Sequence, residues 1–432
     1  MQLCFVSNYI NHHQIPFCDA MYEFLQGEFC FLQMEEMAEE RIRMGWQSTH
    51  DLPYVKKYYE GSDACQNLID NSAVVIYGGV EDERYLVKRL QDGKPVIRYS
   101  ERLYKTGQWK AVSPRGLIKK YTDHTKYRKK DVYLLCAGAY VASDFHIVRA
   151  YPNKMLSWGY FPETKNYDVD KLLAEKGFKL ECATDGDTRI EVIPRIMWAA
   201  RFLDWKHPEL PLETAKWLKD KGYRFHMDII GGGEEEATVK RLYEEYALSD
   251  VVTLQGYKTP EEVRAFMEKA DIYLMTSDRM EGWGAVVNEA MNSGCAVVGN
   301  HMIGAVPYLI DPEKSGRIYH DKDEEMLLEQ VKELCQDAGL RDRLGREAYR
   351  TIAEEWNPAE AAERLLVLLR GLGLLDPGTG QGETQDGRQS RKQGEKQSTG
   401  LYLTGPCSPA PVIGERAMRR LLDRQAAQNR RR

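Results

Sequence analysis

The segment DIYLMTSDRMEGWGAVVNEAMNSG, residues 271–294, decides the fold of this chain. Its first five residues are a hydrophobic run typical of a buried strand, whereas residues 285–291 read as a helix that ends at an Asn-Ser-Gly turn. The residues between them must then form a strand-to-helix loop. In open α/β sheets such loops lie at the carboxyl edge of the strands, where these folds bind ligands. The segment therefore predicts a parallel α/β sheet with a ligand site at this loop.

Two glutamates stand eight positions apart in the segment, Glu281 in the loop and Glu289 in the helix. Gly282 and Gly284 let backbone N–H groups approach a ligand closely, and the amino end of the helix favours negative charge. Glu289 lies about a turn and a half into the helix. Its carboxylate can accept hydrogen bonds from both hydroxyls of a vicinal diol such as a ribose. The loop thus suits a ligand with sugar hydroxyls and phosphates. On this segment alone, two surface charges flanking a helix remain the open alternative.

Neighbouring stretches repeat the strand-then-loop pattern. Residues 295–299 read as a buried strand, and the loop that follows carries Gly304 before a new helix near Pro307, which adds a second set of backbone amides. Upstream, Arg201 and Lys206 follow another buried-strand pattern. At a strand's carboxyl end, such a pair can neutralise a diphosphate, Arg as a fork and Lys as a point charge. Without the other elements, a solvated basic pair is the alternative.

Four elements together resemble the retaining glycosyltransferases of family 4. They are the E-x7-E element with the G-x-V-P loop after it, the strand before Arg201 and Lys206, the strand and glycine turn at 225–234, and the short strand at 251–257. The resemblance covers about residues 190–320. It implies an α/β protein of the GT-B fold: two Rossmann-like domains with parallel sheets that face each other across a cleft, and a C-terminal helix that crosses back to the first domain.

The resemblance also implies roles for these residues. The reaction would transfer a sugar from a nucleoside diphosphate sugar to an acceptor hydroxyl, with retention of anomeric configuration. Glu281 would hold the transferred sugar, while Arg201 and Lys206 would stabilise the departing diphosphate. The donor-binding residues would be Glu289, for the ribose, with Gly282, Trp283, Gly284, Gly231, Tyr257, for the base, and Gly304.

No cofactor and no metal ion is expected. The nucleotide sugar is a substrate, and GT-B enzymes generally need no divalent ion for their chemistry. The three glycines at 231–233 lack the G-x-G-x-x-G spacing, so they indicate no nicotinamide or flavin site.

The length of 432 residues agrees with more than one domain. The predicted division is a first Rossmann-like acceptor domain at 1–158, a linker region at 159–187, a donor domain at 188–355, a crossover helix at 356–373 and a disordered basic tail at 374–432. Strands of the first domain are predicted at 2–7, 29–33, 73–77, 95–99 and 132–136.

Two positions of the first domain depart from the family's pattern. After the first strand the family often has two glycines, whereas this chain has His12 and His13, which either line the acceptor pocket or cap the next helix. After the strand at 95–99, where many relatives carry a histidine close to the reacting sugar, Ser-Glu-Arg stands instead. Glu101 is predicted to position the acceptor or to stabilise the sugar cation, and an ion pair with Arg102 is the alternative.

Charge and cysteine usage limit the classes of partner. Residues 381–432 hold 11 Lys+Arg and 5 Asp+Glu, which gives a net charge of +6. Because the whole chain has a net charge of −6, residues 1–380 carry a net charge of −12. That body is not a general nucleic-acid binder. The nine cysteines include no C-x-x-C pair, which favours reduced thiols in the cytoplasm. No apolar run has the length of a membrane span, although peripheral attachment to the inner face of a membrane stays open.

The sequence gives the least information on the structure of the tail and on the identity of the acceptor. Residues 374–412 are too polar to fold alone, and 415–428 could form a basic amphipathic helix attracted to anionic lipid or nucleic acid, or be a solvated tail. The resemblance suggests a glycan or lipid-linked acceptor, in surface polysaccharide or glycolipid synthesis. The rival functions are a non-catalytic nucleotide-sugar-binding or scaffold protein, a GT-B sugar epimerase and a glycoside hydrolase.

Overall fold

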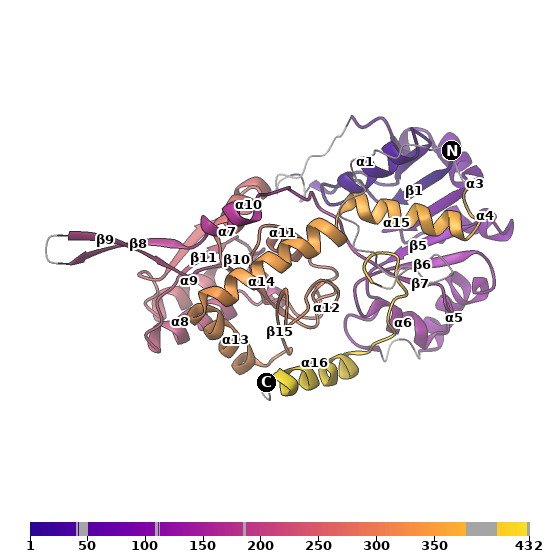
Figure 1. The fold of residues 1–432 in the computed structure, drawn as a ribbon. Helices are drawn as coiled ribbons and strands as arrows, with labels where there is room; N and C mark the ends of the chain where they lie inside the picture. The colour runs from indigo at the N-terminus through magenta and orange to yellow at the C-terminus, as the bar shows by residue number, and fades with distance from the viewer. Residues whose placement is uncertain are drawn as a thin grey trace. The chain divides into compact units, whose positions relative to one another are not determined.

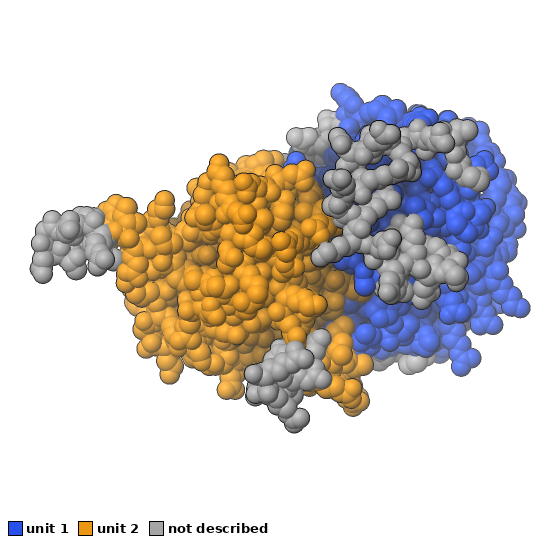
Figure 2. Space-filling view, viewed as in Figure 1, with its two compact units in different colours: residues 1–163, 355–414 blue, residues 164–354, 415–432 orange. Residues whose placement is uncertain are grey.

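The chain forms two compact units (Figure 2). Unit 1 comprises residues 1–163 and 355–414, and unit 2 comprises residues 164–354 and 415–432. The computed structural model describes residues 1–39, 42, 51–108, 111, 113–184, 187–376 and 404–429.

Unit 1 is built on a parallel sheet of seven strands in the order β3-β2-β1-β4-β5-β6-β7 (Figure 1). The strands are β1 (Leu3–Ser7), β2 (Phe29–Gln33), β3 (Val55–Lys57), β4 (Val74–Gly78), β5 (Val96–Ser100), β6 (Val132–Ala137) and β7 (Met155–Trp158). The five predicted strands are confirmed to within a residue at each end. They were visible because hydrophobic runs buried on both faces are typical of parallel strands. β3, a Val-Lys-Lys run, offers no such signal.

Helices connect these strands. They are α1 (Ile15–Phe24), α3 (Ser62–Asn71), α4 (Val87–Gln91), α5 (Pro114–Asp123) and α6 (Val141–Ile147), with short 3-10 turns at Tyr58–Glu60, Glu83–Leu86 and Thr125–Tyr127. Helix α15 (Pro358–Gly371) belongs to unit 1 and packs against α1, with Asn357 Oδ1 accepting a hydrogen bond from the Glu360 N–H at 2.8 Å. The predicted helix at 356–373 is therefore present.

A segment of the predicted tail joins this sheet. The Ser157 N–H donates to the Ser408 carbonyl at 2.7 Å, and the Cys407 N–H donates back to the Ser157 carbonyl at 2.9 Å. Leu156 and Pro409 form an antiparallel bridge. The prediction of disorder is wrong for this stretch, because backbone pairing with the edge strand β7 supplies order that composition does not reveal.

Unit 2 contains a six-stranded parallel sheet in the order β12-β11-β10-β13-β14-β15. The strands are β10 (Arg195–Ala199), β11 (His226–Ile230), β12 (Val252–Gly256), β13 (Ile272–Met275), β14 (Ala296–Asn300) and β15 (Gly316–Tyr319). β10 pairs with both β11 and β13, so the chain reverses its direction of strand addition between β10 and β13. Ligands of open α/β sheets bind beside such a reversal.

The helices of unit 2 are α7 (Val169–Ala174), α8 (Glu209–Asp220), α9 (Glu236–Glu245), α10 (Pro260–Lys269), α11 (Val286–Asn292), α12 (Val306–Leu309), α13 (Glu324–Gln336), α14 (Ala338–Arg350) and α16 (Glu415–Asn429), with a 3-10 turn at Asp204–Lys206 and a π-type turn at Thr351–Glu355. Helices α10, α11, α13 and α14 pack against strands of this sheet, and α16 lies away from it (Figure 1).

The predicted linker region at 159–187 contains regular structure. The unit boundary falls between Glu163 and Thr164, and helix α7 follows it. An antiparallel hairpin of β8 (Phe178–Thr184) and β9 (Asp187–Ile193) then projects from unit 2 (Figure 1). The polar composition of this stretch concealed it, because a two-stranded ribbon buries little apolar surface.

Candidate functional site

The candidate site lies at the carboxyl ends of β10, β13 and β14, next to the reversal in strand order. Arg201 and Lys206 follow β10, Glu281 follows β13 and Gly304 follows β14. Because parallel strands end at the same edge of a sheet, these three predicted loops come together in unit 2.

Backbone and side-chain hydrogen bonds connect the three loops. The Asp278 N–H donates to the Trp205 carbonyl at 3.0 Å, and the Gly304 N–H donates to the Gly282 carbonyl at 3.1 Å. The Thr276 hydroxyl donates to the Lys206 carbonyl at 2.7 Å. These bonds make the positions of the loops interdependent, as a preorganised ligand site requires.

Lys206 and Glu281 form an ion pair within this arrangement. Their side chains are only 14% and 13% exposed, and the Lys206 ammonium lies 4.4 Å from the centre of the Trp205 ring. The predicted partners of these residues are different, the diphosphate for Lys206 and the sugar for Glu281. In the structure each is the other's partner, which places a cation and an anion side by side where both ligand groups were predicted to bind.

Glu289 is half-buried in helix α11. Burial raises the pKa of its carboxyl group to about 7, with the charge of Arg264 acting in the opposite direction. Among the described residues, none donates a hydrogen bond to its carboxylate. The Trp283 ring N–H donates to Asn288 Oδ1 at 2.8 Å and fixes the Glu281 loop to the same helix. A carboxylate without a hydrogen-bond donor is suited to accept hydrogen bonds from the two hydroxyls of a diol.

Two glycines allow loops to approach one another closely. Gly231 has φ +147°, and a Cβ there would lie 1.9 Å from the carbonyl oxygen of Ala200, so the turn after β11 packs directly against the loop that carries Arg201. Gly284 has φ +87°, and a Cβ there would lie 2.9 Å from Ile303. Both positions were predicted to contact the donor, and the structure gives each a packing role as well.

Tyr257 lies at the same edge of the sheet, next to Gly256, whose carbonyl accepts a hydrogen bond from the Gly231 N–H at 2.9 Å. It follows β12, two strands from β10 on the side away from β13, and its side chain is 58% exposed. Arg201 is half-buried, directly after β10.

In unit 1, Glu101 is held by residues that the sequence analysis did not select. The Tyr160 hydroxyl donates to Glu101 Oε1 at 2.5 Å, and Lys105 Nζ lies 3.2 Å from Oε2. Burial raises the pKa of Tyr160 well above its ordinary value. The alternative ion pair with Arg102 is absent from the described contacts, because Arg102 lies 3.8 Å from the buried carboxylate of Asp144 instead.

The two histidines belong to the same neighbourhood. The rings of His12 and His13 lie 3.9 Å apart, and His13 stacks on Tyr160 at 6.4 Å. Helix α1 has Gln14 as its N-cap and no side-chain capping bond, so the capping alternative for the histidines is wrong. Tyr160 could have been suspected only from its place in an aromatic stretch directly after the last strand.

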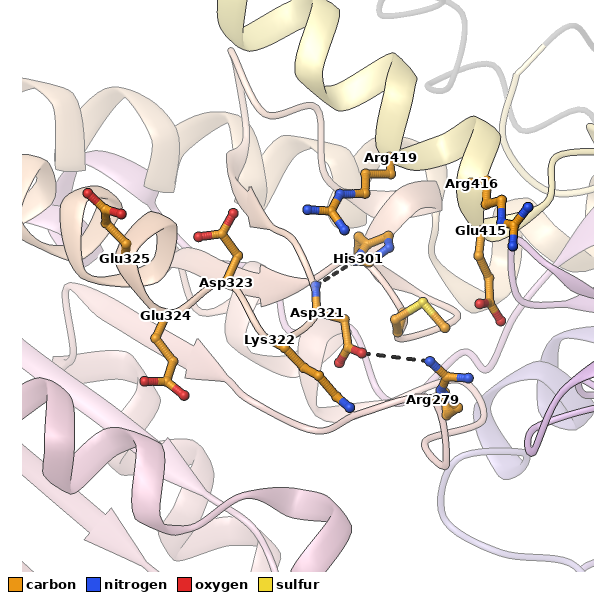
Figure 3. A pocket seen from close by; sticks show the side chains of 11 residues that line it. Arg279, His301, Asp321, Lys322, Asp323, Glu324, Glu325, Glu415, Arg416 and Arg419 are labelled. Atoms are coloured by element: carbon orange, nitrogen blue, oxygen red, sulfur yellow. Dashed lines mark hydrogen bonds and ion pairs between the residues drawn. The ribbon is translucent and has the colours of Figure 1, made fainter.

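A pocket of ≈ 610 Å³ flanks the candidate site in unit 2 (Figure 3). It shares none of the predicted site residues, although Arg279 and His301 adjoin their loops. The Asp321 N–H donates to His301 Nδ1 at 3.1 Å, and burial lowers the pKa of His301 to about 4. The lining residues are Arg279, His301, Met302, Asp321, Lys322, Asp323, Glu324, Glu325, Glu415, Arg416 and Arg419.

The last three lining residues come from helix α16, in the predicted tail. His320 Nε2 lies 2.7 Å from Asp423 Oδ1, and Met418 and Leu422 are buried. The expectation of disorder for 374–432 is therefore also wrong at 415–429, and the open alternative of an amphipathic helix is the one that the structure adopts.

The described residues contain no group of three or more His, Cys, Asp or Glu placed to hold a metal ion. Nor is any described helix long and apolar enough to cross a membrane.

Comparison with known proteins finds a family match for the segment that carries the site. Residues 192–351 match the family of glycosyl transferases group 1. The match covers nearly all of the candidate site in unit 2, from β10 to α14.

Curated glycosyltransferases are similar to this chain over part of their length. The chain is 30% identical over 183 residues to WcaL of Escherichia coli (strain K12), a glycosyltransferase whose name refers to colanic acid biosynthesis, covering 41% of this chain and 45% of WcaL. It is 34% identical over 138 residues to the amylovoran biosynthesis glycosyltransferase AmsK of Erwinia amylovora, covering 31% of this chain and 34% of AmsK. The chain thus aligns with less than half the length of each relative.

Solved structures confirm the predicted fold class. The structure of Alr3699/HepE from Anabaena in complex with UDP matches with a TM-score of 0.60 and 12% identity, over 86% of this chain and 100% of that one. A sucrose-phosphate synthase from Thermosynechococcus elongatus matches with a TM-score of 0.57 and 14% identity, over 86% and 98%. The fold of this chain is GT-B.

Proposed function

We propose that this protein is a retaining glycosyltransferase of family 4 that transfers a sugar from a nucleoside diphosphate sugar to an acceptor hydroxyl. The observation that carries the proposal is the meeting of three loops beside the β10/β13 reversal, with Lys206 and Glu281 in contact and Glu289 in the adjoining helix. This is the arrangement that a ligand with phosphates, a ribose and a second sugar requires.

The leaving group makes the largest electrostatic demand. As the bond between the anomeric carbon and the diphosphate breaks, negative charge grows on the phosphate oxygens and positive charge grows on the sugar ring. Lys206, Arg201 and the amides of the 281–284 loop would stabilise the first charge. Glu281, already beside Lys206, would hold the hydroxyls of the sugar and stabilise the second. Glu289 would accept hydrogen bonds from the ribose hydroxyls.

Proton balance needs no separate base in this scheme. The acceptor oxygen attacks the anomeric carbon on the face from which the diphosphate departs, and the acceptor's proton passes to the departing phosphate oxygen. In unit 1, Glu101 would orient the acceptor, with Tyr160 and Lys105 fixing its carboxylate. His12 and His13 would line the acceptor side of the site.

The partners follow from the chemistry. The donor would be a nucleoside diphosphate sugar, and we propose a glycan or lipid-linked acceptor in surface polysaccharide synthesis, which the names of WcaL and AmsK support. No cofactor or metal ion is proposed. We place the reaction in the cytoplasm, in keeping with the eight free cysteines among the described residues.

A panel of nucleoside diphosphate sugars tests the function. One donor should raise the melting temperature and then be hydrolysed slowly in the absence of acceptor, and the NMR spectrum of the transfer product should show the anomeric configuration of the donor. UDP sugars come first, because the Anabaena structure contains UDP. Binding without turnover across donors and acceptors would support the scaffold function instead. An inverted product would exclude retention.

A further inference from the structure

Helix α5 exposes its apolar residues instead of burying them. Leu117, Ile118 and Tyr121 are 45%, 66% and 59% exposed, and the helix contributes no buried residue to unit 1. Among the described helices, no other one has more than one exposed large apolar side chain. A helix on the surface of a globular protein normally turns its apolar stripe to the core. Helix α5 instead turns its apolar side chains to the solvent.

The exposed residues form one face. At about 100° per residue, Leu117, Ile118 and Tyr121 fall on one side of the helix, around Pro114. Asp123 lies on the opposite side and is 16% exposed. Its backbone carbonyl accepts a hydrogen bond from Arg98 Nη2 at 2.9 Å. The polar side of α5 is therefore the one that faces unit 1.

Both ends of the helix are fixed in this orientation. At the start, the Ser113 hydroxyl oxygen accepts a hydrogen bond from the Gly116 N–H at 3.2 Å. At the end, His124 Nδ1 lies 2.6 Å from the hydroxyl of the buried Tyr151, and the Thr125 hydroxyl donates to the Val148 carbonyl at 3.1 Å. The apolar face is thus presented by a helix that is anchored at both ends.

Basic residues surround this face. Residues 113–130 contain seven Lys+Arg and one acidic residue, a net +6 in a chain whose overall charge is −6. Arg115, Arg128 and Lys129 are exposed, and Lys119 is 67% exposed. Cations beside solvent-facing apolar side chains match a surface that offers both negative charge and an apolar layer.

We propose that α5 and the basic segment after it, residues 124–130, dock on a bilayer that contains anionic phospholipid. Leu117, Ile118 and Tyr121 would enter the boundary between headgroups and acyl chains, while the cations contact the phosphates. Helix α16 is the contrasting case: the sequence marks it as a lipid-binding candidate, yet its apolar residues Met418 and Leu422 are buried. The proposal concerns a surface of unit 1 and is independent of the sugar-transfer chemistry.

Vesicle flotation of the full chain tests the proposal. Wild type should float with vesicles of phosphatidylcholine and phosphatidylglycerol, and much less with phosphatidylcholine alone. Leu117→Ser/Ile118→Ser/Tyr121→Ser should reduce partitioning by at least about tenfold. Arg115→Gln/Arg128→Gln/Lys129→Gln should reduce it by about 100-fold, because each cation near an anionic surface contributes about fivefold. All substituted side chains are exposed, so folding should be retained, which circular dichroism checks.

A matched control uses exposed apolar residues elsewhere. Ile190→Ser/Val192→Ser, in strand β9, removes side chains that are 64% and 60% exposed and should leave partitioning unchanged. A second measurement is the fluorescence of Tyr121→Trp, expected to rise relative to the parent and shift to the blue only with anionic vesicles.

Three results would overturn the proposal. They are no flotation of wild type, equal loss in the β9 control, and unchanged flotation of the α5 triple variant. Concentration-dependent self-association lost in the α5 variant, without flotation of wild type, would assign the face to a second copy of the chain instead. Flotation requires neither donor nor acceptor, so its outcome is separate from the outcome for the transferase.

Discussion

The two sheets of this protein share a topology and differ in the chemistry at their reversal points. In unit 1 the order of strands reverses between β1 and β4, and in unit 2 between β10 and β13. The loops of unit 2 bring together Lys206, Glu281 and close glycine contacts, whereas unit 1 brings together histidine rings, Tyr160 and Glu101. One architecture thus carries two kinds of site, and side chains at equivalent places decide which ligand each can hold.

If this division is right, substitutions in unit 2 should act on the donor and substitutions in unit 1 on the acceptor. The largest effect is expected at Glu281. Glu281→Gln should lower turnover about 100- to 1,000-fold, because it removes the charge that faces the developing sugar cation. Initial rates with the cognate donor measure this. Glu313→Gln, in an exposed loop of the same unit, is the control and should keep wild-type turnover.

Lys206 should have the next largest effect. Lys206→Ala should weaken nucleoside diphosphate binding about 10- to 100-fold, because the phosphates lose a cation and meet an unpaired Glu281 carboxylate. Adding Glu281→Gln should restore part of the affinity, and calorimetry on the single and double variants measures this coupling. Lys216→Ala, which removes an exposed pair with Asp220, should change nothing. Equal weakening of nucleoside monophosphate would contradict contact with the β-phosphate.

Glu289 allows a test of stability against pH. Burial raises the pKa of its carboxyl group to about 7, above the value of about 4.3 for an unfolded chain. The folded state then binds more protons between these values, so stability is lost as the pH rises from the lower value through the higher one. Glu289→Gln removes this titration. It should raise the melting temperature of the ligand-free protein at about pH 8 and change it little at about pH 4. No pH dependence of the difference would contradict the buried carboxylate.

The smallest of these effects is expected in unit 1. Tyr160→Phe removes the hydroxyl that donates to Glu101 and should lower transfer to the acceptor by about tenfold. Nucleotide affinity and slow donor hydrolysis should stay at the wild-type level. A loss of nucleotide affinity in this variant would break the division between the two units.

The sequence predicted strands of both sheets for a physical reason. Most of these strands contain a hydrophobic run, such as Ile272–Met275 in β13, and in unit 2 charged residues or glycines follow several of the runs, so the strand ends are visible. Contacts between distant residues are not visible in this way. The pairing of Lys206 with Glu281 and the bond from Tyr160 to Glu101 depend on side chains that lie 75 and 59 positions apart.

Helices α5 and α16 show a second limit of sequence reasoning. Both combine apolar and basic residues, and composition cannot tell which face a helix turns to the protein. Only packing separates them: α16 buries Met418 and Leu422, while α5 leaves Ile118 in solvent. The stretch 404–410 shows the same limit for the backbone, since its order comes from pairing with β7.

The proposal that unit 2 binds the donor through separate partners for its two glutamates is tested most directly by titrating free nucleoside diphosphate into Glu281→Gln and Glu289→Gln side by side. We expect Glu289→Gln to weaken binding by about tenfold to a hundredfold, since the ribose belongs to the free nucleotide. Glu281→Gln should leave the affinity unchanged or raise it, because the free nucleotide lacks the sugar and Lys206 loses a competing carboxylate. Equal weakening by both substitutions, or wild-type affinity in Glu289→Gln, would contradict the proposed donor site.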